Sequence, residues 1–211
     1  MKSSTILIII LLGFVSVKAQ EITEKHIDFS GKNTVEMNIQ IADSINLHTW
    51  NKNEVYVRAS VNINDNEDNE GYEILFDETG DLVEITGRFK EDYFRGRNNC
   101  CTETDIFWEI HIPERVDFNI ETINGNITID GVTERIRAKS ISGFIDLAAP
   151  SDRNADIKFS TITGTIYTNH ELASDRSQSG VPTVIRQNLN KGGSPVYLET
   201  ISGDIFFRKS N

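Results

Sequence analysis

One six-residue motif occurs four times in the second half of the chain, and it constrains the fold more than any other feature. Each copy reads small polar residue, Ile, small polar residue, Gly, any residue, Ile. The copies occupy residues 122–127, 140–145, 161–166 and 200–205. A motif repeated at a near-constant interval is typical of a solenoid, in which coils stack because a single coil cannot bury its own apolar side.

Aligned on their glycines, the copies place apolar residues at fixed distances from the turn. Ile stands two residues before and two residues after each glycine, and another apolar residue stands five before it. Because side chains alternate between the two faces of a strand, the residue five before Gly is out of phase with both Ile positions. Such a one-residue slip requires a bend or bulge, and we place this corner at the Ser or Thr three residues before each glycine.

The repeat therefore predicts ladders of buried isoleucine inside a β-solenoid, each side chain contributing about 1.5–3 kcal/mol when fully buried. An antiparallel sandwich with coincidental glycine turns is the alternative, but the fixed residue types at aligned positions favour the solenoid. The structural repeat residues are Ile123, Gly125, Ile127, Ile141, Gly143, Ile145, Ile162, Gly164, Ile166, Ile201, Gly203 and Ile205. The predicted corner residues are Thr122, Ser140, Thr161 and Thr200.

The spacing of the motif is irregular at one place. Successive glycines are 18, 21 and 39 residues apart, so the last interval is about two periods long. Residues 170–195, which contain no copy of the motif, are either a degenerate coil with a protruding loop, which we favour, or an inserted loop.

The first half of the chain also has strand patterns and almost no helix signals. Residues 34–63 alternate apolar and polar residues, residues 72–85 suggest a hairpin with a turn at 77–80, and the strand 106–112 ends at Pro113. We therefore predict an all-β chain. Its single β-solenoid domain would span 20–211, with irregular N-terminal coils and a hairpin over 20–112 and regular coils over 113–211.

Residues 1–19 have the three parts of a secretory signal peptide. Lys2 supplies the positive charge, 6–17 is apolar, and a small residue, Ala19, precedes the predicted cleavage point. A membrane anchor is the alternative, but the apolar run is shorter than the roughly 20 residues that span a bilayer. The sequence predicts export to the periplasm or cell surface of a bacterium, with no membrane insertion after cleavage.

The composition excludes some partners. The formal charge is −11, and the signal peptide carries Lys2 and Lys18 without acids, so the mature chain is near −11 − 2 = −13. Nucleic acid binding requires a basic stripe, so no nucleic acid partner is expected, whereas cation binding stays open. The only cysteines are the adjacent Cys100 and Cys101, which are either free or intermolecular thiols or a vicinal disulfide.

The region around the repeats resembles a known family. The features that carry the resemblance are the strand ending in Pro113, the run Ile120-Glu121-Thr122-Ile123-Asn124-Gly125-Asn126-Ile127 with its repeats, and the ending over 190–205. These resemble the putative adhesin family of bacterial exported β-helix domains, a family of unknown function. The match is good over 106–211 and loose before it. The resemblance implies a right-handed parallel β-helix, and it implies no chemistry.

Residue patterns for catalysis or metal binding are weak, so we expect no catalytic residues, no cofactor and no metal. The four histidines, at 26, 48, 111 and 170, are scattered along the chain. A β-helix enzyme acting on polysaccharide is one alternative, with Asp130, Asp146 and Asp204 as its candidate acids. A calcium-dependent adhesive module is another, because 66–77 loosely resembles a calcium loop.

Aromatic and basic residues concentrate in one stretch, 89–97. This mixture is typical of binding surfaces, and Tyr93, Phe94, Arg95 and Arg97 are the candidate binding residues. The same stretch could instead cover an open end of the solenoid. The leading hypothesis is a non-catalytic, exported, adhesin-like module of the cell envelope, whose ligand would be a cell-surface component, protein or glycan. Specificity would then lie in the loops at 64–71, 87–101 and 170–195.

Overall fold

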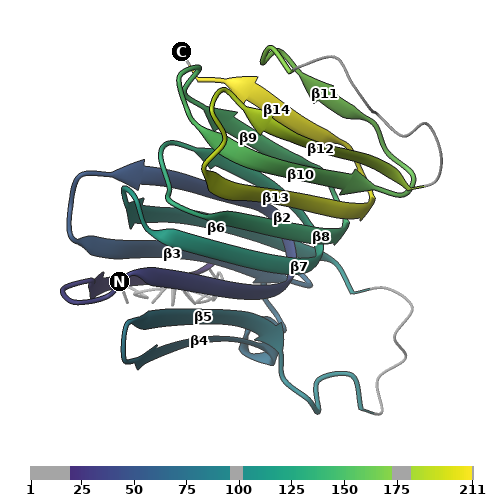
Figure 1. Ribbon diagram of the computed structural model, residues 1–211. Helices are drawn as coiled ribbons and strands as arrows, with labels where there is room; N and C mark the ends of the chain where they lie inside the picture. Colours follow the sequence, from purple (N-terminus) through teal and green to yellow (C-terminus); the bar gives the residue numbers. More distant parts are fainter. Residues whose placement is uncertain (1–19, 96–101, 173–181, 211) are drawn as a thin grey trace, which may run out of the picture.

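The computed structural model describes residues 20–95, 102–172 and 182–210, which form β-strands and one short 3-10 turn, with no α-helix among them (Figure 1). The all-β prediction is therefore confirmed. The strands are β1 (Glu21–Asp28), β2 (Thr34–Trp50), β3 (Glu54–Ile63), β4 (Tyr72–Thr79), β5 (Leu82–Phe89), β6 (Thr104–Pro113), β7 (Asp117–Asp130), β8 (Ile136–Ser142), β9 (Ile145–Ala149), β10 (Ala155–Thr161), β11 (Ile166–Thr168), β12 (Thr183–Leu189), β13 (Ser194–Ser202) and β14 (Ile205–Lys209). The 3-10 turn is Asn69–Gly71.

The strands form one hydrogen-bonded sheet that bends into two layers. The long strands β2 and β7 belong to both layers, because their first halves pair with β5 and β8 and their second halves pair with β6 and β9. The first layer has the order β4-β5-β2-β7-β8-β13-β10-β12, and the second has the order β1-β3-β6-β2-β7-β9-β14-β11. Figure 1 shows the strands rising from β4 and β5 at one end to β11 and β14 at the other.

The apolar core lies between the two layers. The ring of Phe159 in β10 is 5.1 Å from the ring of Phe207 in β14, across the layers. At the other end, Trp108 of β6 packs so close to β5 that a Cβ added to Gly87 would lie 2.5 Å from the indole ring. The buried apolar side chains of both layers form one continuous cluster.

Parallel pairing dominates the sheet. Of its 13 strand pairings, nine are parallel, and the antiparallel ones are β1 with β3, β3 with β6, β4 with β5 and β10 with β12. The parallel stacking of the four motif copies excludes the antiparallel sandwich. A regular right-handed β-helix is not confirmed, because the coils are not stacked in the order in which they occur in the chain.

The last motif copy lies between two earlier ones. Strand β13 pairs on one side with β8 and on the other with β10, so the glycines are stacked in the order 125, 143, 203, 164. Strand β12 pairs in antiparallel orientation with the edge of β10 that β13 leaves free. The prediction of a degenerate coil over 170–195 is therefore wrong for 183–189. The long interval between Gly164 and Gly203 contains β12, which runs antiparallel to β10. This reversal returns the chain to the side where β13 begins, and β13 then pairs in parallel between β8 and β10.

The predicted position of the corner is also wrong. The Ser and Thr residues three before Gly are buried, with exposures of 0–5%, whereas the Ile residues two before Gly are 39–48% exposed. Ile127, Ile145 and Ile205, two after Gly, are fully buried, and Ile166 is half-buried. The change of phase therefore occurs just before the glycine, because the two residues that precede it are both exposed in every copy. The two Ile positions lie on opposite sides of the wall, and only the second belongs to the core.

The motif requires glycine because the backbones of neighbouring coils come into close contact there. In most copies, the hydroxyl three residues earlier can be buried because it forms a hydrogen bond. A Cβ on Gly143, whose φ is +136°, would lie 2.2 Å from the Gly125 carbonyl oxygen, and one on Gly203 would lie 2.1 Å from that of Gly143. In three of the four copies, the hydroxyl three residues before the glycine donates to the glycine carbonyl of the neighbouring coil, whereas the buried Thr122 hydroxyl has no partner among the described residues. These bonds are Ser140 Oγ to Gly125 O (3.3 Å), Thr200 Oγ1 to Gly143 O (3.1 Å) and Thr161 Oγ1 to Gly203 O (2.9 Å).

The N-terminal half follows its predicted strands with small differences. Residues 34–50 form one strand, interrupted by a register shift between Ile41 and Ser44. The hairpin is β4 and β5, but β4 continues to Thr79, so the turn is shorter than predicted. Residues 1–19, which the sequence predicts to be a signal peptide, and Arg97, Cys100 and Cys101 lie outside the described residues. Within the described part, no helix has the length and apolar character needed to cross a bilayer.

Candidate functional site

The stretch proposed from the sequence as a binding surface is in part an internal packing element. Tyr93 is buried, and its ring stacks on Phe89 at 4.7 Å. Phe94 is exposed at one side but also contacts both rings, at 5.0 Å from Phe89 and 4.8 Å from Tyr93. Gly71 is needed there because a Cβ would lie 2.2 Å from the Tyr93 ring. This aromatic cluster packs at the C-terminal end of β5, and Arg95 lies at its edge.

The loop before β4 does not have the form of a calcium loop. Asn69 and Asn64 use their side chains to hold the loop, through Ile63 N to Asn69 Oδ1 (2.7 Å) and Asn64 Nδ2 to Asp68 Oδ2 (2.6 Å). Asp77, the residue at the twelfth position, lies in β4 opposite Glu84. Among the described residues, no group of three or more His, Cys, Asp and Glu could hold a metal ion.

The acids considered for a polysaccharide-cleaving site have separate roles. Asp146 forms a two-point ion pair with Arg208, at 2.7 and 2.9 Å, and this contact raises the pKa of the Arg208 guanidinium. Asp204 accepts a hydrogen bond from Thr165 N at 2.8 Å in the neighbouring coil. Asp130 stands opposite Ala148, so it is not in register with Asp146. No two of these three acids face each other as the two carboxylates of a glycoside hydrolase do.

The structure gathers three of the four histidines that look scattered in the sequence. His26, Tyr56, His111 and His48 stand in register across β1, β3, β6 and β2, on the outer side of the second layer. Trp50 lies beside them, 5.0 Å from the His111 ring and 6.4 Å from the Tyr56 ring. We call these five residues the aromatic face. With strands about 4.8 Å apart, it extends about 14 Å across the sheet.

Polar contacts fix the rings of the aromatic face. Glu54 Oε1 lies 2.9 Å from His26 Nδ1, and Glu109 Oε1 lies 3.2 Å from His111 Nε2. The Trp50 indole N–H donates to the Glu54 carbonyl at 2.7 Å, so the indole is held in place. Successive ring centroids along the row are 4.8, 5.8 and 5.5 Å apart. The result is a row of adjacent rings bordered by the carboxylates of Glu54 and Glu109, with Lys52 Nζ 4.2 Å from the centroid of the Trp50 ring.

Sequence reasoning missed this face because the strands that pair side by side within it do not follow one another in the chain. Each of its residues alternates with buried ones, such as Leu47 beside His48 and Ile110 beside His111. That alternation predicts that the rings point outward. It does not predict that β6 enters between β3 and β2, which is what brings the four ring-bearing strands together.

His170 lies elsewhere and has a different environment. It is buried, and its ring stacks on Phe207 at 4.2 Å. Its Nε2 has no hydrogen-bond partner within the described chain. Burial lowers the pKa of the imidazole below its usual value, and the charge of Lys209 lowers it further. A backbone contact with Arg208 raises the pKa but does not outweigh these two effects. His170 is therefore a packing residue of the last coils.

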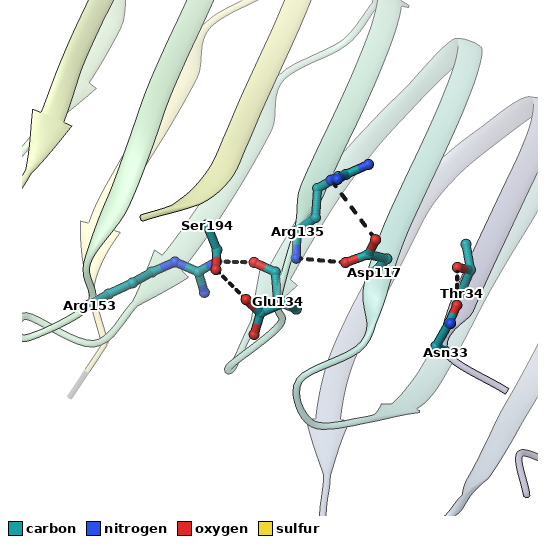
Figure 2. A network of polar contacts seen from close by, with 7 residues as sticks. All are labelled: Asn33, Thr34, Asp117, Glu134, Arg135, Arg153 and Ser194. Atoms are coloured by element: carbon teal, nitrogen blue, oxygen red, sulfur yellow. Dashed lines mark hydrogen bonds and ion pairs between the residues drawn. The ribbon is translucent and has the colours of Figure 1, made fainter. Parts of the chain in front are cut away.

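A polar network joins the starts of the strands in the first layer (Figure 2). Arg153 donates to the Glu134 carbonyl at 2.9 Å, and Ser194 Oγ donates to the Glu134 carboxylate. Burial lowers the pKa of the Arg153 guanidinium. Beside it, Arg135 N donates to Asp117 Oδ1 at 3.3 Å. The network links the starts of β7, β8 and β13, at the ends of these strands that lie away from the glycine corners. Because its polar groups bind one another, we assign it a structural role.

Comparison with solved structures places the fold among bacterial proteins. The chain is similar to a protein described as a putative cell adhesion protein from Clostridium sporogenes, with a TM-score of 0.58 and 13% identity, over 91% of this chain and 100% of that one. A weaker similarity, with a TM-score of 0.37 and 8% identity, is to a putative adhesin from Bacteroides fragilis, over 92% of this chain and 99% of that one.

No protein-family model matches the sequence, and no curated protein matches it. At 13% identity, the similarity to the Clostridium sporogenes protein shows a shared fold and nothing about a shared ligand. The functional argument therefore rests on the surfaces of this chain.

Proposed function

We propose that this protein is a non-catalytic, adhesin-like binding module, exported to the bacterial cell envelope, that contacts a glycan through the aromatic face. The observation that carries the proposal is the row of rings from His26 to His48, with Trp50 beside it. The face lies at the mostly antiparallel end of the sheet, and the parallel stack that continues from β2 would act as a rigid support of the β-solenoid type. The predicted signal peptide and the fold shared with a protein described as a putative cell adhesion protein support this role.

The chemistry of the aromatic face fits sugars without negative charge. Aromatic rings offer apolar surfaces on which the C–H faces of sugar rings can stack, and their edges carry polar groups. The carboxylates of Glu54 and Glu109 can accept hydrogen bonds from hydroxyl groups, but they would repel an acidic sugar. A flat sheet surface with rings in a row suits a chain of several sugar units.

The test is a glycan array, followed by calorimetry on the glycans that bind, with the chain from Gln20 to Asn211. Trp50→Ala and Tyr56→Ala should each weaken binding about fivefold or more, because truncating an aromatic anchor at a binding surface costs more than about 1 kcal/mol. Tyr167→Ala is the matched control, because Tyr167 is also an exposed aromatic residue of the second layer but lies at its far end.

Two results would contradict the proposal. The first is unchanged glycan binding by both variants, which would remove the aromatic face from the site. The second is cleavage of a bound polysaccharide by the purified chain, detected as new reducing ends, which would show a catalytic function.

A further inference from the structure

The outer side of the first layer carries a second distinctive surface. Arg186, Lys158, Tyr197 and Arg137 stand in register across β12, β10, β13 and β8, and Lys139 lies two residues further along β8. We call these five residues the basic row. The ring of Tyr197 is 41% exposed. The row spans about 14 Å, on the opposite side of the molecule from the aromatic face.

The basic row contains cations that are not held in ion pairs within the described part of the chain. Arg137 lies 3.6 Å from Glu121, but Lys139, Lys158 and Arg186 form no ion pair with any described residue. Lys158 and Arg186 are directly opposite each other on adjacent strands, an arrangement of like charges that destabilises a sheet. Lys139 stands in register between Glu121 and Glu199, whereas Lys158 stands in register between Arg186 and Tyr197. The pair Lys158 and Arg186 is therefore the part of the row where an external anion would relieve repulsion.

The ring of Tyr197 lies between two surface hollows that contain the cations. One hollow, of about 180 Å³, is lined by Arg137, Lys139 and Lys158. The other, of about 420 Å³, is lined by Lys158, Arg186 and Asn188. Glu199 borders the first and Asp156 the second, and Asp156 already accepts a hydrogen bond from Gly193 N at 3.1 Å. An anionic group in each hollow could contact two or three cations while a sugar ring stacks on the tyrosine between them.

The positive region is narrow. Continuing the row past Arg137, the next residues in register are Asn119 on β7, Glu36 on β2 and Glu84 on β5. A nucleic acid duplex or an anionic membrane is much wider than the row and would also meet these acids. A single polysaccharide chain can follow the row and avoid them.

From these observations we infer that the basic row binds an anionic polysaccharide, a linear glycan with carboxylate or sulfate groups that occupy the two hollows. This site is separate from the aromatic face and has the opposite charge preference.

The test measures binding of a heparin fragment, as the anionic polysaccharide, to the chain from Gln20 to Asn211 by calorimetry at about 50 mM salt. The double variant Lys158→Gln/Arg186→Gln should bind about tenfold more weakly, because two charge contacts are lost. The control Arg58→Gln/Arg88→Gln removes the same number of charges from ion pairs elsewhere and should bind within about twofold of the original chain.

The melting temperature of the double variant shows whether a loss of binding comes from misfolding. Because Lys158 and Arg186 repel each other, the double variant should melt at the same temperature as the original chain or higher. Full affinity in the double variant would overturn the inference, as would equal loss in the control variant. Equal binding of neutral dextran, single-stranded DNA or vesicles containing phosphatidylglycerol would also overturn it, because the ligand would then not be a specific anionic polysaccharide.

Discussion

The two isoleucines of a single motif copy provide the sharpest test of the fold. Ile201 and Ile205 are four residues apart and look equivalent in the sequence, since each stands two residues from Gly203. In the structure Ile205 is fully buried between the layers, whereas Ile201 is 39% exposed on the outer side of the first layer. Replacing each by Ala removes the same atoms from two different environments.

The expected difference follows from burial. Ile→Ala removes about three methylene equivalents, worth about 0.8 kcal/mol each when they are buried, so the transfer cost at Ile205 is about 2.4 kcal/mol. The cavity left in a closely packed core raises this to about 3–4 kcal/mol. At Ile201 the side chain is already partly in water and no closed cavity forms, so the cost should be about 1 kcal/mol.

Urea unfolding of the two variants, followed by tryptophan fluorescence and circular dichroism, measures both free energies of unfolding against the original chain. Coincident transitions from the two probes justify the two-state treatment, and equal m-values make the midpoints comparable. Equal costs at the two positions would refute the assignment of the phase change to the residues just before Gly203, and so would a larger cost at Ile201.

The remaining predictions concern the corner glycine and the buried histidine. Gly143→Ala should lower the free energy of unfolding by at least about 3 kcal/mol, because its Cβ would meet the Gly125 carbonyl and its φ is +136°. Gly80→Ala, with a φ of +61° and open space, should cost only about 1 kcal/mol, and similar urea midpoints for the two variants would contradict close contact at the corner. Because burial lowers the pKa of His170, the unfolded chain binds its proton more readily than the folded one, so stability should be complete above about pH 6.5 and fall as the pH decreases below it. His170→Phe should reduce this fall in melting temperature, and an unchanged pH profile would show that His170 does not titrate differently on folding.

Local pattern alone predicted a large part of the fold. The alternation over 34–63 and 106–112 matched β2, β3 and β6, and the motif matched strands that stack in parallel. These features depend on interactions between near neighbours in the chain, and strand periodicity records them directly. The change of phase at each motif was also visible in the sequence.

The position of that phase change was not predictable from the spacing. A corner at Thr200 and a corner just before Gly203 both produce a one-residue slip, and they differ in whether Thr200 or Ile201 faces inward. From the sequence alone, Ile201 is expected in the core because isoleucine is apolar and threonine is not. The structure buries Thr200 because its hydroxyl satisfies the Gly143 carbonyl of the neighbouring coil, a contact between residues 57 positions apart.

The candidate sites depended still more on long-range order. The sequence pointed to 89–97, where aromatic and basic residues are adjacent in the chain, but Tyr93 proved to be a packing residue. The aromatic face and the basic row are built from residues on four strands each, and no two strands that pair side by side in either surface are consecutive in the chain.

The sequence by itself determined the strand content, the parallel stacking of the motif copies and the outward direction of residues such as His48 and Lys158. The tertiary structure alone decided that β6 lies between β3 and β2 and that β13 lies between β8 and β10. The physical reason is that side-chain direction follows from the two-residue period of a strand, whereas strand order is chosen by the packing of the whole core. Both proposed binding surfaces are consequences of that order.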